Sequence, residues 1–321
     1  MNVRSLESAD RAAYDELALR HGTLFNRLDW LELFGDRMQV FGLFDEGGTL
    51  VGGLSIFQDR RLGLRIWRRA PFTPSCGPFF APKAQNPVAI LEERRAALDA
   101  LADHVEREAP AICMLPLDRR IQDVLPFFWR GFKVVPNYTY LLDLAPAPEE
   151  LLKNMSPERR KNIGKAGRDG LVVRAETDLR VVRELVLGTF RRQEKFVDEP
   201  CLDAVLFRYA KPSNSFAFVT CRDEMPIAAC FVVYDGQTAY YLLGGYHAAE
   251  RHHGAGAAAM FAAIRHARDL GLKTFDFEGS VIPAIERYFR GFGGQATPYF
   301  TINKAWLPIE IALKFSKRNF F

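Results

Sequence analysis

Apolar and polar positions follow the same order of elements twice along the 321-residue chain. Residues 40–58 form two apolar stretches around an Asp-Glu-Gly-Gly turn, and residues 216–234 repeat this pattern around a short acidic turn. Both segments are typical of β-hairpins. Each hairpin precedes one long helix, predicted over 87–108 in the first half and over 256–270 in the second. The repetition predicts two copies of one structural unit.

The same order continues after the two helices. Short apolar strands are predicted at 111–117 and 274–278. A Gly-Phe turn and an aromatic strand then follow in both halves, after Gly131 and after Gly291. Helices alternating with hairpins and single strands predict an α/β class, an α+β arrangement with mixed sheets.

The two halves are joined by a segment that interrupts both patterns. The strand ending at Leu144 cannot continue through the Ala-Pro-Ala-Pro break over 145–148, and a new helix is predicted to begin directly afterwards. We therefore predict one domain over residues 1–145 and a second over residues 146–321. At roughly 100–200 residues per domain, each half is long enough to bury its own core.

Composition narrows the class of protein without identifying it. The net charge of +4 suits an anionic ligand and is too small for a dedicated nucleic-acid-binding protein. Five cysteines without Cys-x-x-Cys spacing predict neither a disulfide framework nor a metal site, and they indicate a reducing compartment. Because neither a signal peptide nor an apolar stretch of about 18 residues is found, we expect a cytoplasmic protein without a transmembrane segment.

A glycine-rich segment follows the buried strand predicted at 240–246. Residues 251–257 read Arg-His-His-Gly-Ala-Gly-Ala and lead into the second long helix. Glycines let backbone N–H groups approach an anion, and the helix N-terminus adds roughly half a positive charge, so a pyrophosphate is the natural occupant. We expect His252 and His253 to be surface histidines. The candidate residues for binding this donor are Gly244, Gly245, Arg251, Gly254, Ala255 and Gly256.

This Arg-x-x-Gly-x-Gly pattern between a strand and a helix resembles the coenzyme-A loop of the GNAT (N-acetyltransferase-like) superfamily. Residues 145–304 further resemble its Fem-like branch, whose members are tandem-domain proteins. The resemblance therefore implies two tandem GNAT-like domains, with the acyl-donor site in the second. It is carried by Ser156-x-x-Arg159-Arg160-x-Asn162-Ile163-x-Lys165-Ala166-x-Arg168-x-Gly170-Leu171, by Phe275-Asp276-Phe277-Glu278-Gly279-Ser280 and by Ile285 to Gly293.

The resemblance implies transfer of an acyl group to an amine, with acetyl-coenzyme A or another acyl-coenzyme A as donor. Some Fem-like proteins instead transfer amino acids from charged tRNA to peptidoglycan precursors. Aminoacyl-tRNA as donor, and either a small molecule or a peptidoglycan precursor as acceptor, therefore stay open. Many GNAT enzymes place a catalytic tyrosine where this chain has Arg287. A non-catalytic binding module is the third alternative, and no metal is expected.

Three residues are candidates for the chemistry. Asp276 and Glu278 lie two apart on a strand, so their side chains point to one face, where one of them would accept a proton from the attacking amine. Asp276 alternatively bonds the neighbouring backbone and is structural. Tyr288 follows the position of the family's tyrosine by one residue.

Basic and aromatic segments add candidates for substrate binding. Arg159, Arg160, Lys165 and Arg290 are candidates to clamp a phosphorylated substrate, the alternative being a solvated helix face. The Gly/Pro-rich aromatic loop over 71–80 is expected either to shape the acceptor groove or to serve ordinary packing. The apolar and basic run over 305–321 predicts a docked helix or a weak contact with a membrane surface.

Overall fold

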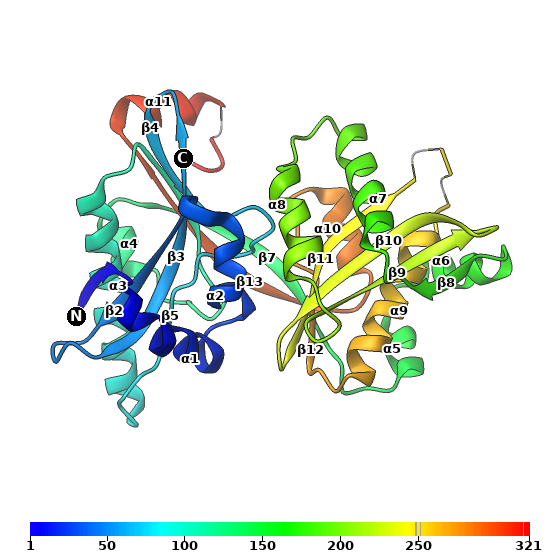
Figure 1. Cartoon of the computed structure of the whole chain (residues 1–321), viewed down its shortest axis with the longest axis horizontal. Helices are drawn as coiled ribbons and strands as arrows, with labels where there is room; N and C mark the ends of the chain where they lie inside the picture. The colour runs from blue at the N-terminus through cyan, green and yellow to red at the C-terminus, as the bar shows by residue number, and fades with distance from the viewer. Residues whose placement is uncertain (248, 251, 317) are drawn as a thin grey trace. The chain divides into compact units, whose positions relative to one another are not determined.

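The chain divides into two compact units, which are described separately (Figure 1). The computed structural model describes residues 1–247, 249–250, 252–316 and 318–321. The first unit comprises residues 1–137 and 298–321, and the second comprises residues 138–297. The strands β7 (Lys133–Asp143) and β13 (Gln295–Ala305) each contain one of the two boundaries.

The first unit holds a mixed sheet with the strand order β1-β2-β3-β4-β6-β13, and β5 pairs with β3. Every pairing is antiparallel except that of β4 with β6, which is parallel and is connected through the long helix α3. The elements are β1 (Asn2–Ser5), α1 (Arg11–His21), α2 (Leu28–Leu31), β2 (Met38–Phe44), β3 (Leu50–Arg61), β4 (Leu64–Arg68), β5 (Phe79–Phe80), α3 (Pro87–Glu108), β6 (Ile112–Pro116), α4 (Leu125–Trp129) and α11 (Leu307–Ser316).

The second unit repeats this arrangement with the order β7-β12-β11-β10-β9-β8. Its one parallel pair, β11 with β12, is connected through α9, as β4 and β6 are connected through α3. The elements are α5 (Pro148–Asn154), α6 (Pro157–Arg168), β8 (Val172–Ala175), α7 (Leu179–Arg192), α8 (Glu199–Ala204), β9 (Ser215–Arg222), β10 (Met225–Tyr234), β11 (Thr238–Tyr246), α9 (Ala255–Asp269), β12 (Thr274–Asp276) and α10 (Pro283–Arg290).

Short helical turns complete the chain, namely η1 (Ser8–Asp10), η2 (Leu24–Asn26), η3 (Glu32–Arg37) and the π-type turn η4 (Val205–Tyr209). The mixed-sheet class and both hairpins are confirmed. The predicted helix over 87–108 is α3, which begins where the Asn86 side chain accepts hydrogen bonds from the backbone of Val88 and Ala89. Pro87 at its first position needs no such partner.

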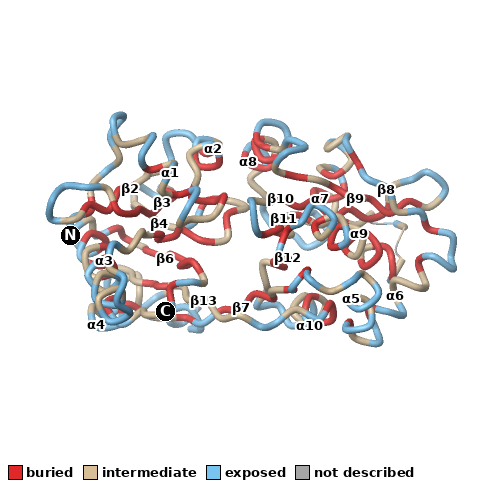
Figure 2. Tube along the Cα trace, turned by 90° about the horizontal axis from the view of Figure 1, so that it is seen from below, coloured by how far each residue is buried: buried red, intermediate tan, exposed pale blue. Residues whose placement is uncertain are grey.

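Each unit buries its own core, and Figure 2 shows the buried residues following the strands while the connecting loops are exposed. In the first unit Trp67, Leu101 and Leu115 pack where α3 covers the sheet. In the second, Ile264 from α9 packs with Phe275 in the corresponding place. Within the described part of the chain, no helix combines the length and apolar character that crossing a bilayer requires.

The division into units differs from the predicted boundary between residues 145 and 146. The first unit ends within β7, and it regains the chain from Pro298 onward, which we had predicted to lie in the second domain. The reason is strand pairing: Thr301 to Ala305 of β13 pair with β6. The terminal residue Phe321 is buried, and the Phe320 carbonyl accepts a hydrogen bond from Asn303.

Candidate active site in the second unit

The parallel strands β11 and β12 separate at the centre of the second unit. They pair only from Thr238 to Tyr240, opposite Thr274 to Asp276. β11 continues to Tyr246 while paired with β10 on its other side. Beyond Tyr240 this edge of β11 therefore has backbone N–H and C=O groups that β12 does not use.

A β-bulge lies at the start of this open edge. The pairing with β10 shifts between Phe231 opposite Leu243 and Val232 opposite Tyr241, so Leu242 is the extra residue. A bulge re-aims the backbone and is over-represented beside active sites. The edge from Leu242 onward is therefore suited to donate hydrogen bonds to a ligand's carbonyl group.

Gly244 and Gly245, predicted to bind the donor, are needed for close packing. A Cβ at Gly245 would lie 2.3 Å from the backbone carbon of Leu185, because α7 crosses β11 there. A Cβ at Gly244 would lie 1.6 Å from the Tyr241 hydroxyl oxygen. Both glycines therefore allow protein groups to approach the strand.

The N-terminus of α9, the predicted pyrophosphate site, is largely occupied by protein groups. The Gly254 N–H donates to Nδ1 of His252 at 3.0 Å, and the Ala255 N–H donates to the His252 carbonyl at 3.1 Å. The other ring nitrogen of His252 lies 2.9 Å from the carboxylate of Asp169. The His252 side chain is 6% exposed, so the expectation of a surface histidine is wrong for this residue.

Helix α6 fills the space beside Gly254. A Cβ there would lie 2.2 Å from the Asn162 carbonyl oxygen and 3.1 Å from the Ala166 side chain. Gly256 is covered in turn by the Tyr246 ring, whose hydroxyl would lie 2.2 Å from an added Cβ. Arg251, the first residue of the predicted motif, lies outside the described residues.

Two tyrosines and a buried arginine meet beside this helix end. The Tyr246 and Tyr288 side chains share a hydrogen bond, and the Arg159 guanidinium lies 4.6 Å from the centroid of the Tyr288 ring. Burial raises the pKa of both tyrosines, while the charge of Arg159 acts in the opposite direction. Tyr288 is therefore protonated at neutral pH and is able to donate a hydrogen bond.

Arg159 is 5% exposed, so it does not lie on the solvated helix face that was the alternative to a substrate clamp. Its guanidinium pairs with Glu158 at 2.6 Å, while its buried Nε has no hydrogen-bond partner among the described residues. A Cβ at Gly291 would lie 2.8 Å from Cγ of Arg159, so this glycine makes room for the arginine stem. Arg159 is thus a buried cation beside the two tyrosines.

Asp276 and Glu278, the two predicted acids, have different environments. The Asp276 carboxylate is buried and accepts hydrogen bonds from the Thr139 hydroxyl and from the Glu278 N–H, the latter at 2.9 Å. It thereby holds the turn after β12, as its structural alternative predicted. Glu278 is half-buried, and its φ of 59° lies in the left-handed region that few non-glycine residues adopt. Strain of this kind gathers at functional sites.

The remaining basic candidates do not join this cluster. Arg160 donates to the carbonyls of Lys153 and Met155, and thereby satisfies the end of α5. Lys165 pairs with Asp169, and Arg290 pairs with Glu286 at 2.8 Å. In the ranges that the structure describes, no group of three His, Cys, Asp or Glu side chains is arranged to hold a metal ion.

Comparison with known proteins agrees with this architecture. Residues 154–290 match the acetyltransferase (GNAT) domain family. The chain is similar to the crystal structure of FemX, with 13% identity, a TM-score of 0.68 and coverage of 98% of this chain and 99% of that one. No curated protein matches the sequence.

Two further structures extend the likeness. The C-terminal domain of a putative lysylphosphatidylglycerol synthetase from Agrobacterium fabrum is 14% identical over 95% of both chains, with a TM-score of 0.59. A tandem GNAT protein from the clavulanic acid biosynthesis pathway is 13% identical over 83% of this chain and 82% of its own, with a TM-score of 0.50. The predicted resemblance to GNAT acyltransferases and the tandem GNAT-like fold, with FemX among the similar structures, are confirmed.

Proposed function

We propose that the chain is an N-acyltransferase that moves an acyl group from acyl-coenzyme A to an amine, with its chemistry in the second unit. The observation that carries the proposal is the open edge of β11 beyond the Leu242 bulge, beside the N-terminus of α9. At the end of this edge the Tyr246 N–H already donates to the Thr189 hydroxyl at 2.9 Å. A GNAT domain matched over residues 154–290 supports acyl transfer as the reaction.

In the proposed reaction the neutral amine attacks the thioester carbonyl. The C–N bond forms, the C–S bond breaks, and coenzyme A leaves as the thiolate. N–H groups on the β11 edge stabilise the negative charge that develops on the carbonyl oxygen. Glu278 accepts the proton that the amine loses. The hydroxyl pair of Tyr288 and Tyr246, in which Tyr288 donates to Tyr246, supplies a hydroxyl donor for the departing sulfur. Holding donor and amine together supplies much of the rate.

Protein groups at the N-terminus of α9 favour aminoacyl-tRNA as an alternative donor. Because His252 and the α6 backbone already contact Gly254, fewer N–H groups are left for a pyrophosphate than the sequence motif implies. Aminoacyl-tRNA, the donor used by some Fem-like proteins, does not require that cradle. Among the similar structures are FemX and the C-terminal domain of a putative lysylphosphatidylglycerol synthetase. A peptidoglycan precursor or another amine is then the acceptor.

The first experiment measures binding of acetyl-coenzyme A by the shift in thermal midpoint. A ligand at about 100 times its dissociation constant adds roughly 2.7 kcal/mol, which raises the midpoint by several degrees. His253 is exposed just before α9, so His253→Glu adds a negative charge at the pyrophosphate position without a steric clash. We expect this variant to fold normally and lose most of the shift.

The matched control is Arg265→Glu, at an exposed position on the same helix further from its N-terminus. This variant is expected to keep the full shift although it changes the charge more. Absence of any shift in the wild type would reject acyl-coenzyme A. Binding of charged tRNA that weakens steeply as salt rises would then support the second donor.

Catalysis is tested separately from donor binding by Glu278→Gln. We expect kcat to fall by 10²-fold or more, in the range of general-base removal, while the dissociation constant of the donor stays unchanged. An unchanged kcat would remove Glu278 from the mechanism. No turnover by the wild type with any amine and either donor would favour the non-catalytic binding module.

A further inference from the structure

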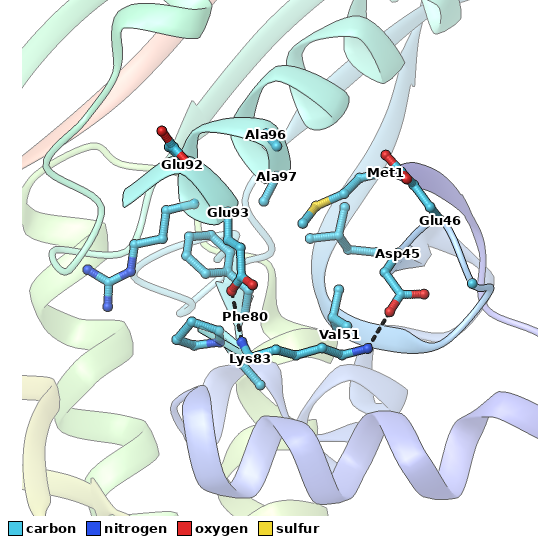
Figure 3. Close-up of a pocket in the computed structure, with 15 residues that line it drawn as sticks. Met1, Asp45, Glu46, Val51, Phe80, Lys83, Glu92, Glu93, Ala96 and Ala97 are labelled. Carbon is cyan, nitrogen blue, oxygen red and sulfur yellow. Dashed lines mark hydrogen bonds and ion pairs between the residues drawn. The ribbon is translucent and has the colours of Figure 1, made fainter. Parts of the chain in front are cut away.

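Two pockets of opposite character adjoin the segment Phe80–Pro82 in the first unit. The pocket drawn in Figure 3, about 460 Å³, is rich in carboxylates. Asp45 pairs there with the Lys83 ammonium, and Glu93 accepts a hydrogen bond from the Lys83 backbone N–H at 2.8 Å. The second pocket, about 520 Å³, shares Phe80, Pro82 and Arg94 with the first, and it also holds Arg20 and Arg120.

The second pocket has apolar walls from three segments. Phe79 and Phe80 come from β5, Leu91 and Leu98 come from α3, and Ile121 follows β6. β5 belongs to the loop over 71–80, for which the sequence left groove lining and ordinary packing open. Apolar walls of this kind suit the body of an apolar ligand, and the polar groups at the rim then decide which head group fits.

The rim is positive because its arginines are only partly matched by carboxylates. Arg94 has no ion-pair or hydrogen-bond partner among the described residues. Arg120 is fixed in place by the Asp118 carboxylate and by the His21 carbonyl at 2.9 Å. The single lining carboxylate, Asp123, is paired with Arg95.

The pKa of His21 is affected by the same positive charges. Its pKa is lowered by burial first, and then by the charges of Arg20 and Arg120. All three residues line the pocket. At neutral pH the imidazole is uncharged and is able to share a hydrogen bond with a ligand, while the arginines supply the positive charge.

We propose that this pocket binds a small anion with an apolar or aromatic body, the head group being a carboxylate or a phosphate monoester. Arg94 and Arg120 contact the head group, and the Phe79–Phe80 segment contacts the body. Guanidinium groups suit both head groups because their paired N–H donors match two oxygens. The proposal does not depend on the acyl transfer proposed for the second unit.

The test is calorimetric titration of the full chain with phenyl phosphate and with phenylacetate, using benzyl alcohol and benzylamine as neutral and cationic controls. We expect at least one of the two anions to bind, and whichever binds more tightly identifies the head group. Binding of benzylamine or benzyl alcohol as tightly as both anions, or no binding of either anion, would overturn the proposal.

Arg94→Glu is expected to weaken binding of the anion at least tenfold. Arg107→Glu is the matched control, because Arg107 is also exposed on α3 but does not line the pocket. Equal weakening by the two variants would show only a general charge effect and overturn the site. As a local readout, the saturating anion should raise the pKa of His21 measured by NMR, since it offsets Arg20 and Arg120; an unchanged pKa would overturn the location.

Discussion

Replacing Gly254 with alanine separates the two interpretations of the glycine-rich loop. If this glycine serves chiefly to admit a pyrophosphate, Gly254→Ala leaves the stability of the free protein unchanged and weakens donor binding. In the structure the glycine admits α6 instead, because an added Cβ would lie 2.2 Å from the Asn162 carbonyl oxygen. We therefore expect the substitution to destabilise the protein in the absence of any ligand.

The magnitude follows from the overlap. Cβ contacts below 3.0 Å are essentially never found, so α6 and α9 must move apart by about 0.8 Å at this point. The neighbour is backbone and cannot rotate away, and overpacking of this kind costs roughly 1–3 kcal/mol. The φ of Gly254 is −94°, which alanine adopts readily. The stiffer unfolded chain offsets about 0.4–1 kcal/mol of this cost, so the net loss is centred on about 1 kcal/mol and is at most about 2.6 kcal/mol.

The assay is thermal and urea denaturation of the ligand-free protein followed by circular dichroism. For a unit of this size each kcal/mol lowers the midpoint by about 2–4 °C. Gly167→Ala is the matched control in α6, because no atom lies within 4 Å of its added Cβ, and alanine in a helix gains about 0.5–1 kcal/mol. A Gly254→Ala protein as stable as the wild type would refute the packing argument.

Three further predictions concern other parts of the chain. His104 is buried, and burial lowers its pKa below the ordinary value of 6.5, so as the pH falls this histidine is protonated in the unfolded chain before it is protonated in the folded protein. The free energy of unfolding should therefore decrease below pH 6.5. Urea denaturation should show a smaller decrease for His104→Phe. Thr139→Val removes a hydroxyl donor from the buried Asp276 carboxylate and should cost about 1–3 kcal/mol, and an unchanged urea midpoint would contradict this. Leu307, Ile311 and Phe315 form an exposed apolar stripe on α11, so replacing all three with Glu should abolish co-sedimentation with anionic vesicles; wild-type protein that stays in the supernatant would rule out membrane contact.

Elements with strong local signals could be predicted from the sequence. The hairpins over 40–58 and 216–234 carry their turn residues between apolar strands, and they correspond to β2 with β3 and to β9 with β10. Helix α3 begins at the predicted residue because Asn86 and Pro87 supply a cap and a fixed φ. The repeated order of elements predicted two copies of one unit, and the resemblance to Fem-like proteins implied that both are GNAT-like.

Features that depend on contacts between distant segments could not be predicted. The sequence of β13 shows an aromatic strand, but nothing in it specifies pairing with β6, which lies far earlier in the chain. From the sequence, Gly254 and Gly245 are as compatible with a ligand-binding loop as with close helix packing. In the structure, α6 packs against Gly254 and α7 packs against Gly245. The role of His252 could not be predicted, because a histidine that accepts a hydrogen bond from the N–H of a helix N-terminus has the same sequence context as a surface histidine.

The turn after β12 links structure and chemistry most closely. A turn that requires two consecutive left-handed residues is most easily built from glycine or asparagine, yet Glu278 precedes Gly279 there, with φ values of 59° and 62°. Gly279 is needed because a Cβ would lie 1.9 Å from the Tyr138 carbonyl oxygen, and this close approach does not explain the glutamate at 278. Asp276 and Thr139 hold the conformation by hydrogen bonds. A strained glutamate that its neighbours maintain at the point where β11 and β12 separate is therefore a reason to propose Glu278 as the proton acceptor, because strain of this kind gathers at functional sites.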